Sequence, residues 1–387
     1  MTAKHMTGIV PILTLGVFSI INTEMGVIGI LPLIAETYQV TLTRAGLLVS
    51  LFALAIAVSG PTMPLLFSGM NRKHAMLMVL GVFSAGTLVS AFTDSFAVLV
   101  AARVIPAFFH PVYCSLAFTV AAASAERPEE APKAVARVIM GVSAGMVLGV
   151  PLVSYLSYVT SLRMGMLSFF AVTVAVLLAT LFLVPSMPAR ERLSYGTQLR
   201  VLKKRPVWLA FFAVVFLNGA IFGVYSYFAG FLEAVTGMSG KTVSILLLVY
   251  GLANIAGNVI AGRQLSRRPA FFTGGFPFLL GAVYIVLLLA GQFTVVTAVL
   301  TLIWGVLAGA GANINQYLLM TAAPEAPDFA NGLFLTATNL GTTVGATVCG
   351  LFISNLGLRY SIIQGLLFLL VCTVLFGVTG MIDVQKT

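Results

Sequence analysis

Charged residues are scarce in this chain: only 8% of its 387 residues are Asp, Glu, Lys or Arg, whereas 59% are hydrophobic. The surface of a water-soluble domain needs roughly a quarter of its residues charged, so this composition excludes one. Lipid tails solvate Leu, Val, Ile and Phe, and a mean hydropathy of +1.06 is typical of a protein embedded in a bilayer.

Residues that bind metals or perform catalysis are also few. The chain has three cysteines and three histidines, and no C-x-x-C pair or other metal-ligand spacing occurs among them. A membrane enzyme would need His, Asp or Glu clustered at the interface, and this sequence has no such cluster. A G-x-x-x-x-G-K-S/T loop is absent too, which argues against ATP hydrolysis as an energy source. We therefore expect no enzyme activity, no metal and no cofactor.

Long apolar runs between short polar turns predict an all-α membrane protein. The length of the chain leaves room for about twelve spans of roughly 20 residues. The runs are at 8–34, 43–66, 74–93, 96–124, 134–160, 163–185, 207–234, 241–262, 269–290, 294–321, 329–356 and 359–381. The longest polar connection lies at the midpoint. It divides the chain into an N-terminal six-helix bundle at 1–185, a basic linker at 186–206, and a C-terminal six-helix bundle at 207–387.

A net charge of +10 is compatible with nucleic-acid binding. The positions of the basic residues argue against nucleic acid as a partner. Most of the 21 fall in the turns on one face of the predicted bundle: Lys4, Arg72, Lys73, Arg127, Lys133, Arg137, Arg190, Arg192, Arg200, Lys203, Lys204, Arg205, Arg263, Arg267, Arg268 and Lys386. The positive-inside rule assigns that face to the cytoplasm. Since the number of spans is even, both termini are predicted to be cytoplasmic.

Glycines recur at four-residue spacing in two of the spans. Gly141, Gly145 and Gly149 precede Pro151 in span five, and Gly341 and Gly345 repeat the spacing in span eleven. Small residues let helix backbones approach closely, and Pro151 removes one backbone hydrogen bond, which predicts a bend. Two repeats of this kind typically surround a central site near the bilayer midplane. The alternative interpretation, that the glycines only pack helices, does not explain why the two halves share the pattern.

Several motifs resemble those of one family. They are Asn22-Thr23-Glu24-Met25-Gly26 and Gly29-Ile30-Leu31-Pro32 in span one, Arg103-Val104-Ile105-Pro106 with His110 in span four, and the Gly-Pro run of span five. They resemble the major facilitator superfamily, specifically its twelve-span drug/proton antiporter group with arabinose-efflux-permease-like members. Gly60, Arg72 and Lys73 fit the cytoplasmic loop motif of that family, although Ser68 replaces the loop Asp. The resemblance implies two pseudo-symmetric bundles in a bacterial inner membrane.

Two charges stand out deep within the predicted spans, where a charge is costly and therefore a functional candidate. Glu24 lies roughly 24 Å from the cytoplasmic start of span one, and Arg103 lies roughly 10 Å from the outer start of span four. Both residues are therefore expected in the outer third of a ~30 Å hydrocarbon core. We expect Glu24 to accept a proton and Arg103 to change its affinity for that proton. His110, two turns further along span four, is predicted to relay the proton or contact substrate. The alternatives are a static ion pair and a structural histidine.

The other polar residues deep within the spans are uncharged. We assign to the substrate cavity a set of amide and aromatic side chains: Asn22, Phe212, Asn218, Phe222, Tyr225, Asn313, Gln316 and Asn339. Each of them can equally serve as a contact between helices. A cavity of this composition favours a neutral or amphipathic ligand.

The sequence therefore predicts a secondary active transporter that exports a small neutral or amphipathic compound in exchange for protons. It is expected to act as a monomer, with the small-molecule substrate, protons and lipid bilayer as its partners. The alternative is a uniporter or proton symporter for a sugar or nucleoside-like solute.

Overall fold

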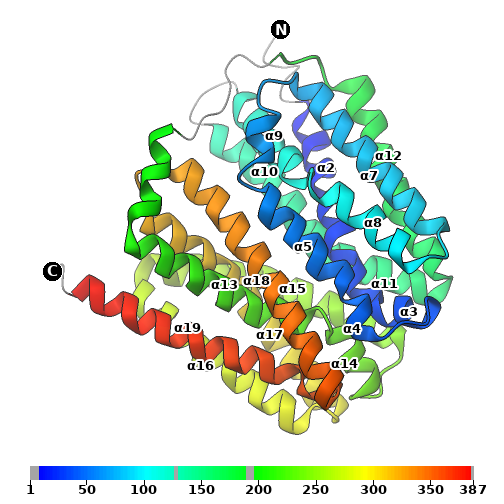
Figure 1. Cartoon of the computed structure of the whole chain (residues 1–387), viewed down its shortest axis with the longest axis vertical. Coiled ribbons are helices and arrows are strands. Elements are labelled where there is room, and N and C mark those ends of the chain that lie inside the picture. The colour runs from blue at the N-terminus through cyan, green and yellow to red at the C-terminus, as the bar shows by residue number, and fades with distance from the viewer. Residues whose placement is uncertain (1–7, 126–129, 189–195, 385–387) are drawn as a thin grey trace. The chain divides into compact units, whose positions relative to one another are not determined.

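The computed structural model describes residues 8–125, 130–188 and 196–384 (Figure 1). The middle of the predicted linker, at 189–195, lies outside these ranges, as do the predicted cytoplasmic residues Lys4, Arg127, Arg190, Arg192 and Lys386. Helix is the only regular structure in the described part of the chain. Eleven of the described helices are long and apolar enough to cross a membrane.

The chain separates into two compact units. Unit 1 comprises Met1–Ile30 and Val58–Ser194, and unit 2 comprises Leu31–Ala57 and Tyr195–Thr387. The helices described in unit 1 are α2 (Val10–Gly26), η1 (Val27–Ile30), α6 (Met63–Leu66), α7 (Arg72–Phe92), α8 (Phe96–Ala107), α9 (His110–Ala123), α10 (Ala131–Ala144), η3 (Gly145–Gly149), α11 (Val150–Val159) and α12 (Leu162–Leu183). Helix α5 (Leu47–Ser59) belongs almost entirely to unit 2 and ends in unit 1.

The other helices of unit 2 begin with α3 (Leu31–Thr37) and α4 (Leu42–Ala45). They continue with η4 (Gly196–Lys203), α13 (Arg205–Tyr225), α14 (Phe228–Ala234), α15 (Gly240–Arg267), α16 (Pro269–Ala290), α17 (Thr294–Ala322), α18 (Pro327–Leu356), η5 (Leu358–Tyr360) and α19 (Ser361–Val384). Within this unit Thr43 donates a hydrogen bond to the carbonyl of Gly350, 3.3 Å away, which ties the start of span two to α18. The predicted N-terminal bundle at 1–185 includes residues 31–57, whereas the structure groups these residues with unit 2.

Local sequence signals explain where several spans begin. Asn71, Ser95, Ser161 and Ser239 each accept a hydrogen bond from a backbone N–H in the first turn of the helix that follows. Of the twelve predicted spans, eleven are among the apolar helices of membrane-crossing length. The 30-residue helix α18 occupies the place of predicted span eleven, although it is not among those eleven.

The predicted end of span two at residue 66 is wrong. Helix α5 ends at Ser59, and the one-turn helix α6 follows after a short break. Pro61 cannot donate a backbone hydrogen bond and disfavours helical geometry at Gly60, so the helix ends before this pair.

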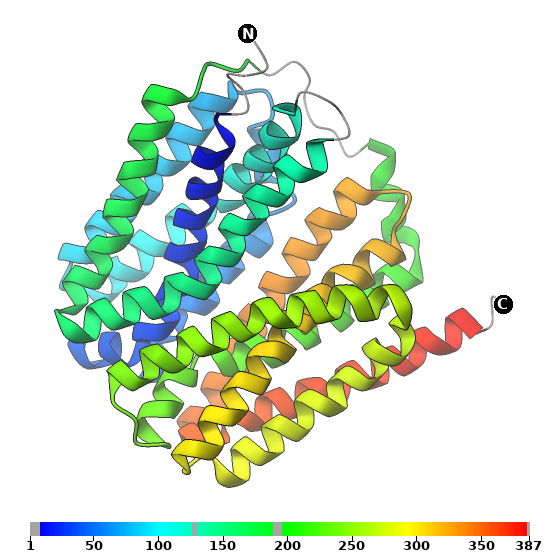
Figure 2. The ribbon, with the colours of Figure 1, turned by 180° about the vertical axis from the view of Figure 1, so that it is seen from behind.

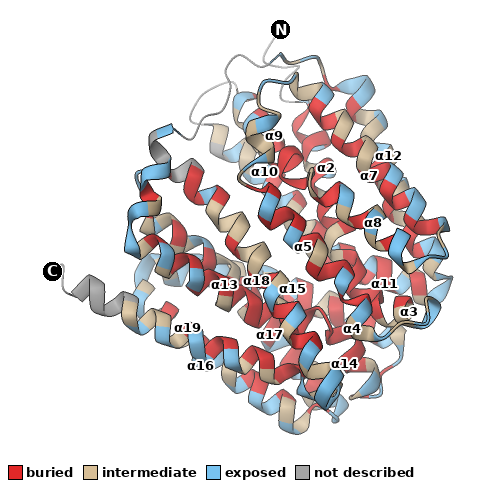
Figure 3. Ribbon diagram, viewed as in Figure 1, coloured by how far each residue is buried: buried red, intermediate tan, exposed pale blue. Residues whose placement is uncertain are grey.

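Burial distinguishes the central helices from the peripheral ones (Figure 3). In span one (Val10–Thr37) and span seven (Arg205–Ala234), 72% of the apolar window is buried, against 28% in span six (Leu162–Leu183). Figures 1 and 2 show α2, in dark blue, running between α10 and α12 within unit 1. In unit 2, α13 packs against α17, α18 and α19. Large apolar side chains exposed on the outer helices, such as Phe182 and Phe271, face lipid in a membrane protein.

The internal repeat predicted from the glycines is present in the packing of both units. A β-carbon added at Gly145 would lie 3.1 Å from the carbonyl oxygen of Phe18, and one added at Gly345 would lie 2.5 Å from that of Gly219. One turn earlier, the corresponding contacts join Gly141 with Thr14 and Gly341 with Val215. Span five thus packs on span one in the same register in which span eleven packs on span seven. The chain consists of two pseudo-symmetric halves.

Candidate functional site: a buried polar network in unit 1

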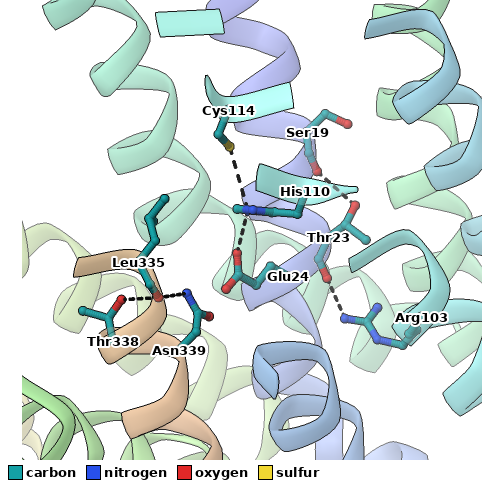
Figure 4. A network of polar contacts seen from close by, with 9 residues as sticks. All are labelled: Ser19, Thr23, Glu24, Arg103, His110, Cys114, Leu335, Thr338 and Asn339. Carbon is teal, nitrogen blue, oxygen red and sulfur yellow. Dashed lines mark hydrogen bonds and ion pairs between the residues drawn. The ribbon is translucent and has the colours of Figure 1, made fainter. Parts of the chain in front are cut away.

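Glu24 and His110 form an ion pair inside unit 1 (Figure 4). The Nε2 atom of His110 lies 3.1 Å from Oε2 of Glu24, and the two side chains are 6% and 11% exposed, respectively. The pair joins α2 to α9, the second half of span four. Polar groups buried within apolar helices have few other partners, so each of these side chains satisfies the other.

Breaks in the helices position both members of this pair. Pro106 lies near the end of α8 and Pro111 in the first turn of α9, so span four is interrupted and His110 begins its second half. Glu24 lies in the last turn of α2, directly before the 3₁₀ segment η1. Interrupted helices inside a membrane protein are tolerated where neighbouring groups compensate for the lost hydrogen bonds, and they are a common feature of transport sites.

Arg103 lies next to this pair and contacts the backbone of α2. Its Nη2 atom donates a 2.7 Å hydrogen bond to the carbonyl of Thr23, and its side chain is almost wholly buried. Because Thr23 immediately precedes Glu24, the guanidinium is fixed close enough to act electrostatically on that carboxyl. The sequence predicted that Glu24, Arg103 and His110 act together. In the structure, the side chain that contacts the Glu24 carboxylate is that of His110.

Sequence reasoning did not include Cys114 or Ser19 in this region. The Cys114 thiol lies 3.9 Å from Nε2 of His110, one helical turn away on the same face of α9, and the spacing of four residues was a signal for this contact. The hydroxyl groups of Ser19 and of Thr173 in α12 form a 2.9 Å hydrogen bond. The first contact lies within α9, and the second ties α2 to α12. Nδ1 of His110 makes no hydrogen bond with any described residue.

The glycines of span five lie directly against α2. A β-carbon at Gly145 would meet the side chain of Ile21 at 2.8 Å, and one at Gly149 would meet the amide oxygen of Asn22 at 2.5 Å. Asn22, predicted to line the substrate cavity, is 4% exposed at this helix crossing. The π-helical segment η3 directly precedes Pro151, which has no N–H to bond to the carbonyl one turn earlier.

In unit 2, Asn218 is at the centre of a second buried polar group. Its amide donates hydrogen bonds to the carbonyl of Thr338 at 2.7 Å and to the hydroxyl of Thr342 at 2.9 Å, and it accepts one from Asn315 at 3.3 Å. These contacts join α13, α17 and α18. Asn339, another predicted cavity residue, donates to the carbonyl of Leu335 within its own helix, as Figure 4 also shows.

The other predicted cavity residues of unit 2 differ in their exposure and in their contacts. Phe222 contacts the ring of Tyr225, whose side chain is buried against Tyr250. Phe212 is 45% exposed and contacts Trp208 and Phe211 near the start of α13. The amide of Asn313 donates to Asn258 of α15, and Gln316 is exposed. The sequence indicated the polar character of these helices, whereas the contacts depend on how each helix is rotated.

The loop after span two is attached to the end of span six. The Lys73 ammonium donates a 2.8 Å hydrogen bond to the carbonyl of Leu181 near the C-terminus of α12, where a cation is favourable. The backbone N–H of Arg72 donates to Met187, and Gly60 is buried in the turn after α5. Asn71, which the sequence did not indicate, accepts from the N–H of Lys73 and donates to the Ser186 hydroxyl at 2.7 Å.

Replacing Asn71 tests this attachment. Asn71→Ala is expected to lower the free energy of unfolding by about 1 kcal/mol, because the helix α7 loses its cap and the loop loses its bond to Ser186. Asn71→Asp keeps the acceptor oxygen and should lose less than half as much. Thermal unfolding of the purified protein in detergent measures both variants. Equal losses for Ala and Asp would show that the cap is not what matters.

The amino-acid sequence matches the Major Facilitator Superfamily over residues 13–327, with a further match over 224–383. The chain belongs to the Major Facilitator Superfamily. This superfamily member is 30% identical over 387 residues to the uncharacterized MFS-type transporter YtbD of Bacillus subtilis (strain 168), with 97% of each chain covered. It is 26% identical over 352 residues to the putative transporter AraJ of Escherichia coli (strain K12), covering 90% of this chain and 88% of AraJ.

Two further similarities bear on function and fold. A probable sugar efflux transporter of Pasteurella multocida (strain Pm70) is 26% identical over 357 residues, covering 92% of this chain and 88% of that protein. The crystal structure of a bacterial homolog to the human lysosomal transporter Spinster, inward-facing and unoccupied, has a TM-score of 0.82 at 17% identity, with 98% of each chain covered. The superfamily member is thus a multi-pass secondary transporter with the major facilitator fold, from a family of transporters rather than enzymes.

Proposed function

We propose that this protein exports a small neutral or amphipathic compound in exchange for protons, by alternating access. The observation behind the proposal is the Glu24–His110 ion pair, buried between two interrupted helices of unit 1. A proton-coupled transporter needs a group whose affinity for a proton changes during the cycle, and intramembrane carboxylates and histidines serve this purpose. Its energy source is the proton gradient, without a cofactor.

The geometry of the pair supports a cycle of proton uptake and release. When His110 is within 3.1 Å, a charged Glu24 is stabilised by its partner. A movement of α9 relative to α2 that separates the two leaves the carboxylate without this partner in apolar surroundings, where the protonated form is favoured. Arg103, bonded to the carbonyl of Thr23, keeps a positive charge beside the carboxyl and promotes release of the proton when the pair closes again.

The glycine contacts supply surfaces on which the helices can move. Span five meets span one through Gly141, Gly145 and Gly149, and span eleven meets span seven through Gly341 and Gly345. Smooth contacts without interlocking side chains permit sliding, and the π-helical segment before Pro151 adds a point of bending. We propose that helices slide at these contacts within each of the bundles at 1–185 and 207–387 during alternating access, and that the protein acts as a monomer.

Orientation follows from the positive-inside rule: the basic turns, the linker at 186–206 and both termini face the cytoplasm. The bacterial relatives support placement in a cytoplasmic membrane. Export is favoured over import because one relative is named a probable sugar efflux transporter and because the span motifs resemble the antiporter group.

Proton flux measured during transport tests the proposal. The protein is reconstituted in vesicles with an imposed pH gradient and an internal pH dye, and benzanilide, tetraphenylphosphonium, arabinose or uridine is added. Antiport requires that at least one compound moves protons opposite to itself. Protons moving in the same direction as the compound would establish a symporter. Compound movement without any proton movement would establish a uniporter, and either result would reject the proposal.

A further inference from the structure

Four aromatic side chains surround Trp304 of α17 in the interior of unit 2. The ring centroids of Tyr225, Tyr250, Tyr284 and Phe228 lie 6.1, 5.4, 5.4 and 4.8 Å from that of the indole, and all four rings are nearly perpendicular to it. Tyr225 and Tyr250 stack on each other at 4.5 Å. All five side chains are buried: Tyr225 and Tyr250 are 4% and 5% exposed, and Trp304, Tyr284 and Phe228 are 0% exposed.

The internal repeat places this cluster at the position in unit 2 that corresponds to the polar network of unit 1. Gly145 packs on the carbonyl of Phe18, and Gly345 packs in the same way on that of Gly219. Six residues after Phe18 lies Glu24, and six residues after Gly219 lies Tyr225. Both residues come directly before a break in their helix and face the fourth span of their half. The position used for the titratable pair in unit 1 is thus occupied by aromatic rings in unit 2.

Two polar groups of the cluster, the Tyr250 hydroxyl and the Trp304 Nε1–H, are buried without a hydrogen-bond partner among the described residues. The Tyr250 hydroxyl is buried and makes no hydrogen bond with any described residue, whereas the Tyr284 hydroxyl donates to the carbonyl of Ala220 at 2.7 Å. A buried hydroxyl left unpaired costs free energy, and a phenylalanine would fill the same space without that cost. A tyrosine at this position is explained if a ligand completes the hydrogen bond.

Amide groups continue from the aromatic pair along α15. Asn254 and Asn258 follow Tyr250 at intervals of four residues and are partly exposed. The Asn258 amide donates to the side-chain oxygen of Asn254 at 2.9 Å and accepts from Asn313. The sequences 206–225, 242–262 and 294–322, which form most of α13, α15 and α17, contain no Asp, Glu, Lys or Arg. This surface offers stacking and neutral hydrogen bonds, and it offers no countercharge.

We propose that Tyr225, Tyr250 and Trp304 form a substrate subsite for the planar ring of an uncharged compound. The ring stacks against the tyrosine pair, its polar edge bonds to the Tyr250 hydroxyl, and Asn254 and Asn258 bind a further polar group. This inference rests on the proposed transport function and specifies its substrate class. It assigns proton coupling to unit 1 and ring recognition to unit 2.

Tryptophan fluorescence tests the subsite, because the chain has only two tryptophans. Trp208 lies near the start of α13 and is 42% exposed, so Trp208→Phe leaves Trp304 as the only indole. This variant is titrated in detergent with benzanilide and with its saturated counterpart N-cyclohexylcyclohexanecarboxamide, which has the same amide without planar rings. Benzanilide should change the Trp304 emission in a saturable manner, with at least about tenfold higher affinity than the saturated amide. The Trp304→Phe protein, which reports only Trp208, should show no saturable change.

Hydroxyl variants made in the Trp208→Phe background separate binding from packing. Tyr250→Phe should weaken benzanilide binding at least about tenfold while leaving the unfolding temperature unchanged or higher, because it removes an unpaired hydroxyl. Tyr284→Phe loses a bond that is made in the protein, so it should lower the unfolding temperature and affect binding less than Tyr250→Phe does. Equal affinity for the two amides, no saturable change with benzanilide, or unchanged binding by Tyr250→Phe would each overturn the subsite.

The titration needs no pH gradient, so it is independent of proton coupling. The emission change should persist in a Glu24→Gln background. Benzanilide binding in the titration, together with compound movement but no proton movement in the vesicle assay, would reject antiport and leave the subsite standing. Proton-coupled transport without preference for the planar amide would do the reverse.

Discussion

Vesicles containing the Glu24→Gln protein are expected to show no substrate-driven proton movement above that of protein-free vesicles. Glutamine has the shape of glutamate and can accept a hydrogen bond from Nε2 of His110, but it does not titrate. The contact between α2 and α9 is therefore kept while the group proposed to take up the proton is lost. Proton flux after addition of a transported compound from the panel measures the effect.

Glu36→Gln is the matched control for this variant. The chemical change is identical, and Glu36 lies exposed on α3. The control should keep wild-type proton flux. Proton-coupled transport by Glu24→Gln at the wild-type rate would reduce the Glu24–His110 pair to a structural contact.

His110→Gln tests the partner in the same assay. It keeps a hydrogen-bond donor toward Glu24 but removes the charge that can stabilise the carboxylate, so the pH dependence of transport should shift or be lost. Unchanged coupling and an unchanged pH profile would remove His110 from the mechanism.

Gly145→Val is expected to abolish transport and to destabilise unit 1 by about 1–3 kcal/mol or more. A β-carbon at this position meets the Ile21 side chain at 2.8 Å and the carbonyl oxygen of Phe18 at 3.1 Å, so α2 and span five must separate. The backbone carbonyl cannot yield as the end of a flexible side chain can. The added methyl groups also interlock with α2 and prevent the proposed sliding movement.

A control for this variant is available in the same unit. Gly81 of α7 has no heavy atom within 4 Å of an added β-carbon, so Gly81→Val should retain transport and unfold within about 0.5 kcal/mol of the wild type. Thermal unfolding and vesicle transport measure both variants. Wild-type transport by Gly145→Val would contradict a mechanical role of the glycines, and Gly345→Val extends the test to the other half.

Much of the fold is encoded in local sequence. The predicted spans agree with the described helices to within a few residues at most ends, because the length of an apolar run and the capping residues beside it act locally. The end of span two was missed because the apolar run continues through Pro61 to Leu66, and hydrophobicity outweighed the breaking effect of the Gly60–Pro61 pair. Agreement was poorest where a breaker lies inside an apolar run.

The candidate site was only partly predictable. Glu24, Arg103 and His110 stood out because charged and titratable residues are rare in apolar spans. Tyr250 and Trp304 did not, because aromatic residues are ordinary components of membrane helices and nothing in their spacing distinguishes a cluster from packing. Their significance emerged from the unpaired Tyr250 hydroxyl and from the repeat.

The sequence by itself determined the membrane class, the helices, the two-fold repetition and the rarity of buried charge, because each depends on composition or on spacing along one chain. Only the tertiary structure decided that Glu24 pairs with His110 while Arg103 bonds to the Thr23 carbonyl, and that the glycines of span five meet span one. Each residue along an α-helix turns its side chain by about 100°, so contacts between helices depend on their rotation and crossing. Those are fixed by the packing of the whole bundle.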